Sequence, residues 1–218
     1  MKPGIRGGRL ARDLEARGIK DRRVLDAMAA IPRESFVEEA LRAKAYDDAS
    51  LPIGEKQTIS QPWIVARMCE LVAGDGSGRV LEIGSGSGYH AAVLGQIFEQ
   101  VYSVERLELL SRRARATVRA LGIENVHFKI FDGSYGWSEF APYKAVVVTA
   151  AAIEVPAPLL DQLEEGGKLV IPIAKSPEQA DPEDQKLVRV VKTATGTRRE
   201  DHGPCRFVPL VGKFGWES

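Results

Sequence analysis

The sequence predicts an α/β fold, a doubly wound, mostly parallel sheet of seven strands with an N-terminal helical extension. Short apolar runs alternate with helical patterns between residues 79 and 173, which is the rhythm of βαβ units. Three consecutive runs end in an acid or a glycine turn, at Glu82, Glu105 and Asp132. Because the carboxyl ends of parallel strands meet at one edge of a sheet, these residues are expected to form one ligand site.

The first 62 residues are predicted to form a helical cap followed by a loop. Apolar residues recur at helical spacing, Pro32 stops the second helix, and a third short helix is expected over 36–41. We expect these helices to pack on the sheet and to have no direct catalytic role. The segment 51–62 is dense in turn residues, hydroxyls and amides and is predicted to be a loop. Ser60 in this loop has two interpretations, the N-cap of the helix that carries Trp63 or a member of a site.

The segment 79–89 predicts a strand, a glycine turn and the start of a helix. Gly84, Gly86 and Gly88 fall at every second residue and Glu82 precedes the first of them by two. A dinucleotide fingerprint has a different spacing, G-x-G-x-x-G, so a pyrophosphate is not the expected ligand. A tight turn that binds no ligand is the alternative.

The next two strands, 101–105 and 126–131, end in Glu105 and in Asp132-Gly133. Glu105 follows the glycines by about twenty residues, the offset at which a carboxylate binds two ribose hydroxyls. The Asp132 carboxylate is expected to accept a hydrogen bond from the amino group of an adenine. The turn and the two acids together predict a nucleotide-like cofactor.

Beyond the cofactor turn, helices are predicted over 91–98, 107–121 and 156–163, and apolar strands over 145–148 and 169–173. A surface loop is expected over 176–184 and a final pair of strands over 187–191 and 206–211. The length of 218 residues suits a single domain, 1–218. It is divided into 1–62 (helical cap and substrate loop), 63–175 (cofactor-binding core) and 176–218 (C-terminal strand pair).

Composition and cysteine spacing argue against nucleic acid, a membrane or a metal ion as a partner of this chain. Lys plus Arg and Asp plus Glu each number 30, so the electrostatic footprint of a nucleic-acid-binding protein is missing. No stretch has the length of a membrane span and no apolar leader follows the basic N-terminus, so a cytoplasmic protein is expected. Cys69 and Cys205 lie far apart and show no metal-ligand spacing, so no metal is expected.

An acid followed by Gly-x-Gly-x-Gly after a strand resembles the first signature of class I S-adenosyl-L-methionine (SAM) methyltransferases. Nearly the whole chain also resembles the protein-L-isoaspartate O-methyltransferase family, and two motifs are particular to that family. They are the Gln57-Thr58-Ile59-Ser60-Gln61-Pro62 loop and the ending Phe207-Val208-Pro209-Leu210-Val211-Gly212. Further matches are Pro52-Ile53-Gly54-Glu55, Trp137, Val148-Thr149-Ala150-Ala151 and 163–172.

The resemblance implies transfer of a methyl group from SAM, with S-adenosyl-L-homocysteine as product, to the free α-carboxylate of an L-isoaspartyl residue. The ester collapses to a succinimide, which partly returns to aspartate, so the activity is protein repair. The implied partners are isoaspartyl proteins and peptides, and the chain is expected to be a monomer. A carboxylate is ionised at neutral pH, so the reaction needs no general base.

The resemblance also implies the site residues. Ser60 is the catalytic residue, because its hydroxyl orients the substrate carboxylate. The implied cofactor-binding residues are Thr58, Ser60, Glu82, Gly84, Ser85, Gly86, Ser87, Gly88, Glu105, Asp132 and Gly133. The implied substrate-binding residues are Gln57, Thr58, Ile59, Ser60, Val208, Pro209 and Leu210.

Three positions depart from the family pattern. Lys56 and Phe131 stand where glycines are common, and Lys144 stands where an aspartate usually opens the fourth strand. There are two alternatives to the repair activity, and Lys56 and Lys144 are the only hints of the second. One is a SAM methyltransferase of the same fold that acts on another carboxylate or on RNA, and the other is a cofactor-binding protein without turnover.

Overall fold

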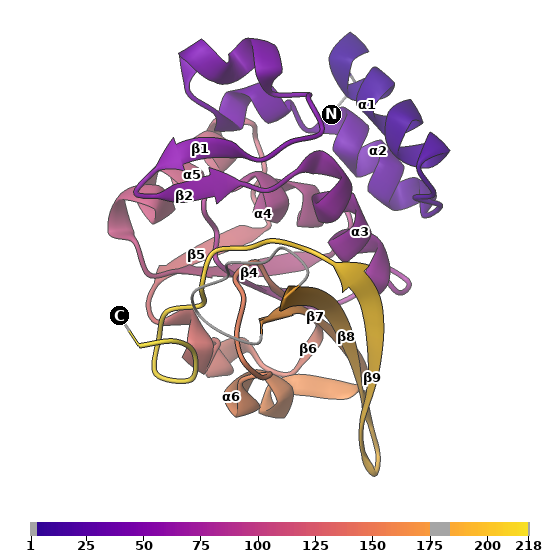
Figure 1. The fold of residues 1–218 in the computed structure, drawn as a ribbon, viewed down its shortest axis with the longest axis vertical. Coiled ribbons are helices and arrows are strands. Elements are labelled where there is room, and N and C mark those ends of the chain that lie inside the picture. The colour runs from indigo at the N-terminus through magenta and orange to yellow at the C-terminus, as the bar shows by residue number, and fades with distance from the viewer. Residues whose placement is uncertain (1–3, 175–183, 218) are drawn as a thin grey trace.

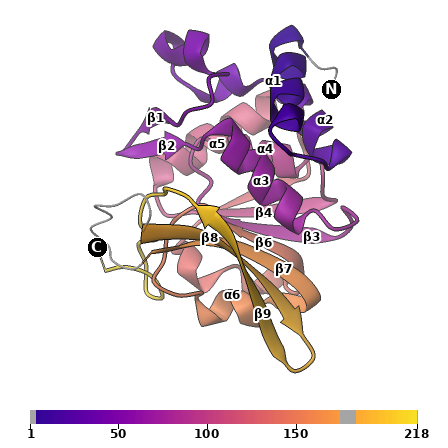
Figure 2. The ribbon, with the colours of Figure 1, turned by 45° about the vertical axis from the view of Figure 1, so that its right-hand side comes forward.

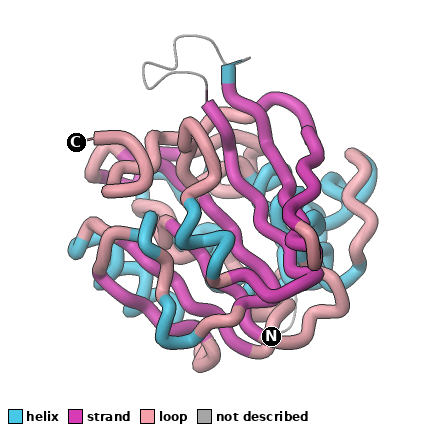
Figure 3. Tube along the Cα trace, turned by 90° about the horizontal axis from the view of Figure 1, so that it is seen from below, coloured by secondary structure: helices cyan, strands magenta, loops and turns pink. Residues whose placement is uncertain are grey.

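The large sheet of the computed structural model, which describes residues 4–174 and 184–217, confirms the predicted α/β architecture (Figure 1). It has seven strands in the order β5-β4-β3-β6-β7-β8-β9. The strands are β3 (Arg79–Ile83), β4 (Gln100–Glu105), β5 (Val126–Ile130), β6 (Tyr143–Val148), β7 (Leu163–Ala174), β8 (Gln185–Thr193) and β9 (Gly196–Pro204). Seen from below, the strands run side by side across the molecule (Figure 3).

The strands from β5 to β7 are parallel, whereas β8 and β9 are antiparallel to their neighbours. The chain passes from β3 outward to β4 and β5, then returns to place β6 on the other side of β3. The strand order therefore reverses between β3 and β6. In open α/β sheets, ligands bind at such a reversal, outside the carboxyl ends of the strands.

Helices cover both faces of this sheet (Figure 2). The helices α3 (Pro62–Val72), α4 (Tyr89–Leu94) and α5 (Glu108–Ala120) bury apolar side chains in one core together with the N-terminal extension. The opposite face is covered by α6 (Ala157–Asp161) and by the 3₁₀ turn η4 (Ser138–Phe140), and another 3₁₀ turn, η3 (Gly133–Tyr135), follows β5. The predicted helices over 91–98 and 156–163 are thus shorter than expected.

The N-terminal extension packs over the first of these cores. It consists of α1 (Ile5–Ala16), α2 (Arg22–Ala30) and two 3₁₀ segments, η1 (Arg33–Phe36) and η2 (Glu39–Lys44). The third short helix predicted over 36–41 is therefore wrong in form, because Val37 is extended and separates the two turns. Leu14, Val24 and Met28 are almost fully buried, so the extension belongs to the folded core.

The segment predicted as a loop over 51–62 contains a two-stranded hairpin, β1 (Leu51–Gly54) and β2 (Gln57–Ile59). Leu51, Ile53 and Ile59 are buried at alternate positions of these strands, a period-2 pattern that the intervening polar residues mask. The turn places Glu55 and Lys56 in the left-handed region, with φ of 50° and 56°. The prediction of an irregular loop was wrong here.

The last strand is also misplaced in the sequence prediction. β9 covers Gly196–Pro204, and 206–211 forms no strand, although Pro209 makes an isolated bridge with Ala151. The error has a physical reason, because β9 is an edge strand that pairs through its backbone and exposes most of its charged side chains. The predicted surface loop over 176–184 lies outside the described residues except for Asp184.

Candidate cofactor and substrate site

A cavity opens at the carboxyl ends of β3, β4 and β6, where the strand order reverses. The cavity is lined by the glycine turn (84–87), by residues 57–60 and by the C-terminal segment, residues 208–211. Its lining includes most of the residues implied by the resemblance, namely Gln57, Thr58, Ile59, Ser60, Gly84, Ser85, Gly86, Ser87, Glu105, Gly133, Val208, Pro209 and Leu210. Glu82, Gly88 and Asp132 lie outside this lining.

Close packing fixes the shape of the glycine turn. Gly84 has φ of 94°, and a Cβ there would lie 2.4 Å from Thr149 Oγ1. The Thr149 hydroxyl is directed at the carbonyls of Ile83 (3.0 Å) and Gly84 (2.7 Å), so it ties the end of β6 to the turn. Gly88 has φ of 87°, and a Cβ there would approach Ala114 of α5 to 2.9 Å. Gly88 is therefore required for packing between the turn and α5.

Glu105 ends β4 with a buried carboxylate that lines the cavity. Its Oε2 accepts a hydrogen bond from the backbone N–H of Gly86 (3.0 Å) and its Oε1 accepts one from Leu107 (2.9 Å). A carboxylate has about four acceptor positions, so two remain for hydroxyls of a ligand. The orientation of Glu105 is fixed in advance by the turn that it faces.

Glu82 lies beneath the turn rather than in the cavity. Its Oε2 accepts a hydrogen bond from the Ser103 hydroxyl, which in turn lies 2.5 Å from Ser85 Oγ. Full burial raises the pKa of Glu82 to about 8, so the side chain is mostly a neutral acid at pH 7. Glu82 supports Ser85 from below.

Asp132 is occupied by main-chain contacts. Its Oδ1 accepts from the Ser134 N–H (2.9 Å) and its Oδ2 from the Lys213 N–H (2.8 Å). These bonds tie the C-terminal segment to the end of β5. The neighbouring Gly133, and not the Asp132 side chain, lines the cavity.

Ser60 is half-buried between β2 and α3 and lines the cavity. The N-cap position of α3 is Gln61, followed by Pro62 at the first helical position, and the Trp63 N–H of the first turn donates to Asp48 Oδ1 (3.0 Å) rather than to Ser60. The interpretation of Ser60 as a helix cap is therefore wrong. Its carbonyl accepts a hydrogen bond from Arg33 Nη2 (2.7 Å).

A second groove continues outward from Ser60. It shares Thr58, Ser60, Thr149 and Val208 with the cavity and extends to the first turn of α3 and to residues 204–207. Its outer lining includes Asp48, Gln61, Trp63, Cys205, Arg206 and Phe207. The two spaces meet at Ser60, so a bound cofactor and an extended peptide would approach each other at this residue.

Sequence reasoning assigned no contact to several residues that line the cavity. They are Val65, Ile83, Tyr89, His90, Val104, Arg106, Leu107, Thr149, Ala150 and Val211. Thr149, which follows β6, had an available signal, because β6 is one of the parallel strands whose carboxyl ends meet at the site. Burial lowers the pKa of His90 to about 3, which keeps the ring neutral.

The donors and acceptors of the cavity fit SAM. Glu105 suits the two ribose hydroxyls, and the glycine turn brings its backbone to the lining of the cavity. The cofactor carries no phosphate, in agreement with the absence of G-x-G-x-x-G spacing. Among residues 4–174 and 184–217, no group of three or more His, Cys, Asp or Glu side chains is placed to hold a metal ion.

Comparisons with known proteins agree with this geometry. The model of a family described as protein-L-isoaspartate(D-aspartate) O-methyltransferase matches residues 6–215. Protein-L-isoaspartate O-methyltransferase 2 of Geotalea uraniireducens is 54% identical over 93% of this chain and 91% of that protein.

Two solved structures are also similar. A protein-L-isoaspartate O-methyltransferase superposes with a TM-score of 0.84 at 34% identity, covering 95% of this chain and 66% of that one. A Plasmodium falciparum structure described as the same kind of enzyme, in complex with S-adenosyl-L-homocysteine, has a TM-score of 0.79 at 24% identity, covering 97% and 99% of the two chains. The second of these supports the fold alone.

Proposed function

Because this chain belongs to the protein-L-isoaspartate(D-aspartate) O-methyltransferase family, we propose that it repairs damaged proteins by methylating the free α-carboxylate of L-isoaspartyl residues. One observation carries the proposal: the cavity, which is lined by the glycine turn and Glu105, meets the outer groove at Ser60, directly after β2. This junction is where a methyl donor and a peptide carboxylate would come together.

SAM, when bound, supplies an electrophilic methyl group on a sulfonium ion. Glu105 holds the ribose hydroxyls, and the backbone of residues 84–88 surrounds the amino-acid tail. Asp132 and Glu82 act indirectly in this proposal, by holding the ends of β5 and β3 in place. The direct adenine contact expected of Asp132 is not part of this proposal, because Asp132 does not line the cavity and its oxygens accept three hydrogen bonds, from the Ser134 N–H, the Ser134 hydroxyl and the Lys213 N–H.

The chain's role in the transfer is orientation and exclusion of water. An isoaspartyl carboxylate is already ionised at neutral pH and needs no base to activate it. His90, the histidine in the cavity lining, is kept neutral by burial, and no step depends on it. The Ser60 hydroxyl donates a hydrogen bond to one carboxylate oxygen and directs the other toward the methyl group, with Gln57, Thr58, Ile59 and the segment 208–210 enclosing the substrate. Such orientation contributes at most about 7–11 kcal/mol to lowering a barrier.

Labelled methyl transfer to an isoaspartyl peptide, beside the same peptide with ordinary aspartate, tests the function. We expect base-labile label in the isoaspartyl peptide only. Equal labelling of both peptides would indicate a different carboxylate specificity, and labelling of neither, with SAM bound, would indicate a protein without turnover.

Isoaspartyl proteins are the partners of this activity. We propose that the chain works as a monomeric single domain in the cytoplasm and does not act on nucleic acid. The equal numbers of acidic and basic residues support the last point. Steeply salt-dependent, tight binding to RNA would contradict it. Among the described helices, none combines the length and the apolar character needed to cross a bilayer.

A further inference from the structure

Arg33, in the N-terminal extension, is fully buried and reaches the loop that carries Ser60. Its Nη2 donates to the Ser60 carbonyl and its Nε to the Ala45 carbonyl, both at 2.7 Å. The guanidinium also lies over the Tyr89 ring, 4.7 Å from its centroid. Tyr89 is the first residue of α4, directly after the glycine turn. One side chain therefore contacts the end of the extension at Ala45, the residue that follows β2 and the first residue of α4.

No ion pair joins Arg33 to a carboxylate in residues 4–174 and 184–217. Asp48, whose charge favours the protonated guanidinium, is itself paired with Arg17. Burial lowers the pKa of Arg33, but an arginine in a protein keeps its proton. Arg33 Nη1 is buried and has no partner among the described atoms. A buried charge that has no carboxylate partner and one nitrogen without a hydrogen bond is costly, so stability alone gives a poor account of this residue.

We infer that Arg33 is a positioning residue for methyl transfer, which fixes the Ser60 backbone so that the Ser60 hydroxyl faces the bound carboxylate. This inference rests on the role proposed above for Ser60. Ser60 lies between a three-residue strand and α3, and the Asp48 carboxylate holds Gln61 and Trp63 at the start of that helix but does not contact the Ser60 carbonyl, which accepts its hydrogen bond from Arg33. The hydrogen bond from Arg33 therefore restrains the Ser60 peptide group from behind the cavity.

A lysine cannot take over this function. The planar guanidinium donates in two directions at once and stacks on Tyr89, whereas an ammonium group on a flexible stem is a point charge. Arg33→Lys keeps the charge and reaches at most one of the two carbonyls well. The Arg33→Lys variant therefore tests the hydrogen-bond geometry of Arg33 while its positive charge is retained.

The test is a double-mutant cycle between Arg33→Lys and Ser60→Ala, with kcat and KM for an isoaspartyl peptide and calorimetric S-adenosyl-L-homocysteine affinity. We expect Arg33→Lys to lower kcat about tenfold, because a displacement on the order of 1 Å can cost a hundredfold. Its cofactor affinity should stay within about twofold. In the Ser60→Ala background, Arg33→Lys should cause almost no further loss, because the hydroxyl that it positions is gone. Equal losses in both backgrounds, or no loss in either, would overturn the inference.

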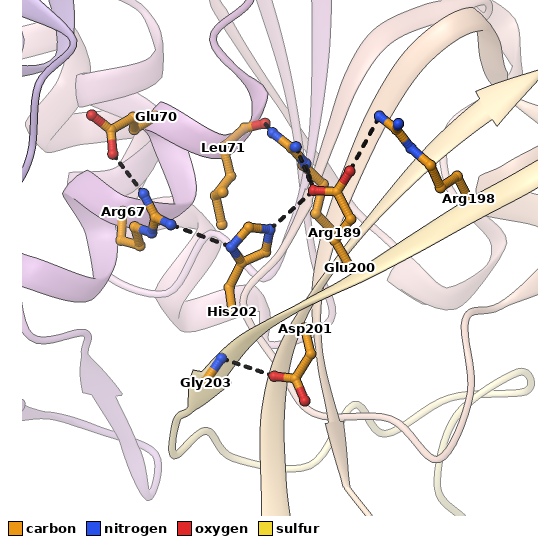
Figure 4. A network of polar contacts seen from close by, with 9 residues as sticks. All are labelled: Arg67, Glu70, Leu71, Arg189, Arg198, Glu200, Asp201, His202 and Gly203. Atoms are coloured by element: carbon orange, nitrogen blue, oxygen red, sulfur yellow. Dashed lines mark hydrogen bonds and ion pairs between the residues drawn. The ribbon is translucent and has the colours of Figure 1, made fainter.

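Arg189→Lys is the matched control. Arg189 donates to the Leu71 carbonyl (3.4 Å) at the other end of α3 and pairs with Glu200 (Figure 4). It lies outside the lining of the cavity and groove, so its replacement should lower the melting temperature and leave kcat unchanged.

Arg33→Gln, which retains one planar donor group, serves as the second variant if Arg33→Lys does not fold. If neither variant binds S-adenosyl-L-homocysteine, Arg33 is a folding residue and the inference fails. A parent enzyme that binds cofactor but methylates no isoaspartyl peptide would overturn the proposed function itself. An active parent without coupling between Arg33 and Ser60 would overturn only the inference.

Discussion

The carboxylate of Glu105 accepts a hydrogen bond from the backbone N–H of Gly86, with an N–O distance of 3.0 Å. The end of β4 and the turn that follows β3 are thus joined directly. The acid that we assign to the ribose hydroxyls is held in place by the same turn that surrounds the rest of the cofactor. Binding therefore requires little reorganisation of this side chain.

Replacing Glu105 by Ala should weaken S-adenosyl-L-homocysteine binding by about 1.5–3 kcal/mol, the range for hydrogen bonds to a charged group. Turnover at saturating SAM should fall less, because Glu105 lies away from the reacting carboxylate. Calorimetry measures the affinity, and Glu108→Gln, an exposed acid that pairs with Arg112 on α5, is the control. Unchanged affinity in the Glu105 variant would remove this residue from the cofactor site.

Replacing Glu82 by Gln should change how stability depends on pH. Burial raises the pKa of Glu82 to about 8, from its ordinary value of 4.5. Since the native state binds the proton more tightly, its contribution to stability is complete below pH 4.5 and is lost as pH rises toward 8. Gln has no proton to lose, so between pH 6 and pH 8 the parent should lose about 2–3 kcal/mol relative to the variant.

Urea unfolding at several pH values between 5 and 9 measures this difference. Parallel stability curves for the parent and the Glu82→Gln variant would show that Glu82 keeps an ordinary pKa in the folded protein.

The sequence predicted those parts of the molecule in which local pattern and tertiary role agree. The apolar strands β3, β4 and β6 are buried on both faces, and the glycine turn has a spacing that depends on backbone geometry alone. The strand β9 was missed because its backbone pairing leaves no hydrophobic period in the side chains. Arg33 was missed because its contacts with Ala45 and Ser60 join residues that only the tertiary fold brings together.

Two of the three departures from the family pattern, Lys144 and Phe131, lie away from the cavity. Lys144 lies near the amino end of β6, at the edge of the sheet away from the site, and its Nζ pairs with Asp75 (2.9 Å) and donates to Ser77 (2.6 Å). Phe131 is half-exposed after β5 and packs against Tyr135. Neither residue lines the cavity, so neither supports the alternative of a protein without turnover.

Lys56 is the departure that we expect to affect stability. Lys56 lies in the β1–β2 turn with φ of 56°. A residue with a side chain is strained in this conformation, whereas the glycine that is common in the family adopts it without strain. Lys56→Gly should relieve about 1–2 kcal/mol of left-handed strain and lose about 0.5–1 kcal/mol of chain entropy. We expect a net gain of a few tenths to about 1 kcal/mol in thermal or urea unfolding. A loss of stability would show that the Lys56 side chain makes a compensating contact.

Ser60→Ala tests the residue on which the mechanism depends. The structure removes the capping role, because Gln61 occupies the N-cap of α3, so the variant should lose little stability. If the hydroxyl positions the carboxylate, kcat/KM for an isoaspartyl peptide should fall by one to two powers of ten, about 1.4–2.7 kcal/mol of transition-state stabilisation. Affinity for S-adenosyl-L-homocysteine should hardly change.

Ser60→Thr should lie between the parent and Ser60→Ala. It keeps the hydroxyl, but the added methyl crowds a junction at which in-line approach tolerates little displacement. Ser138→Ala, the same chemical change on the exposed η4 turn, controls for the general effect of removing a hydroxyl. Because the cap is already excluded, parent-like turnover in a folded, cofactor-binding Ser60→Ala enzyme would leave Ser60 without a role in methyl transfer. Orientation of the carboxylate would then have to come from the backbone of Thr58 to Ser60 and from the segment 208–210, which also lines the cavity.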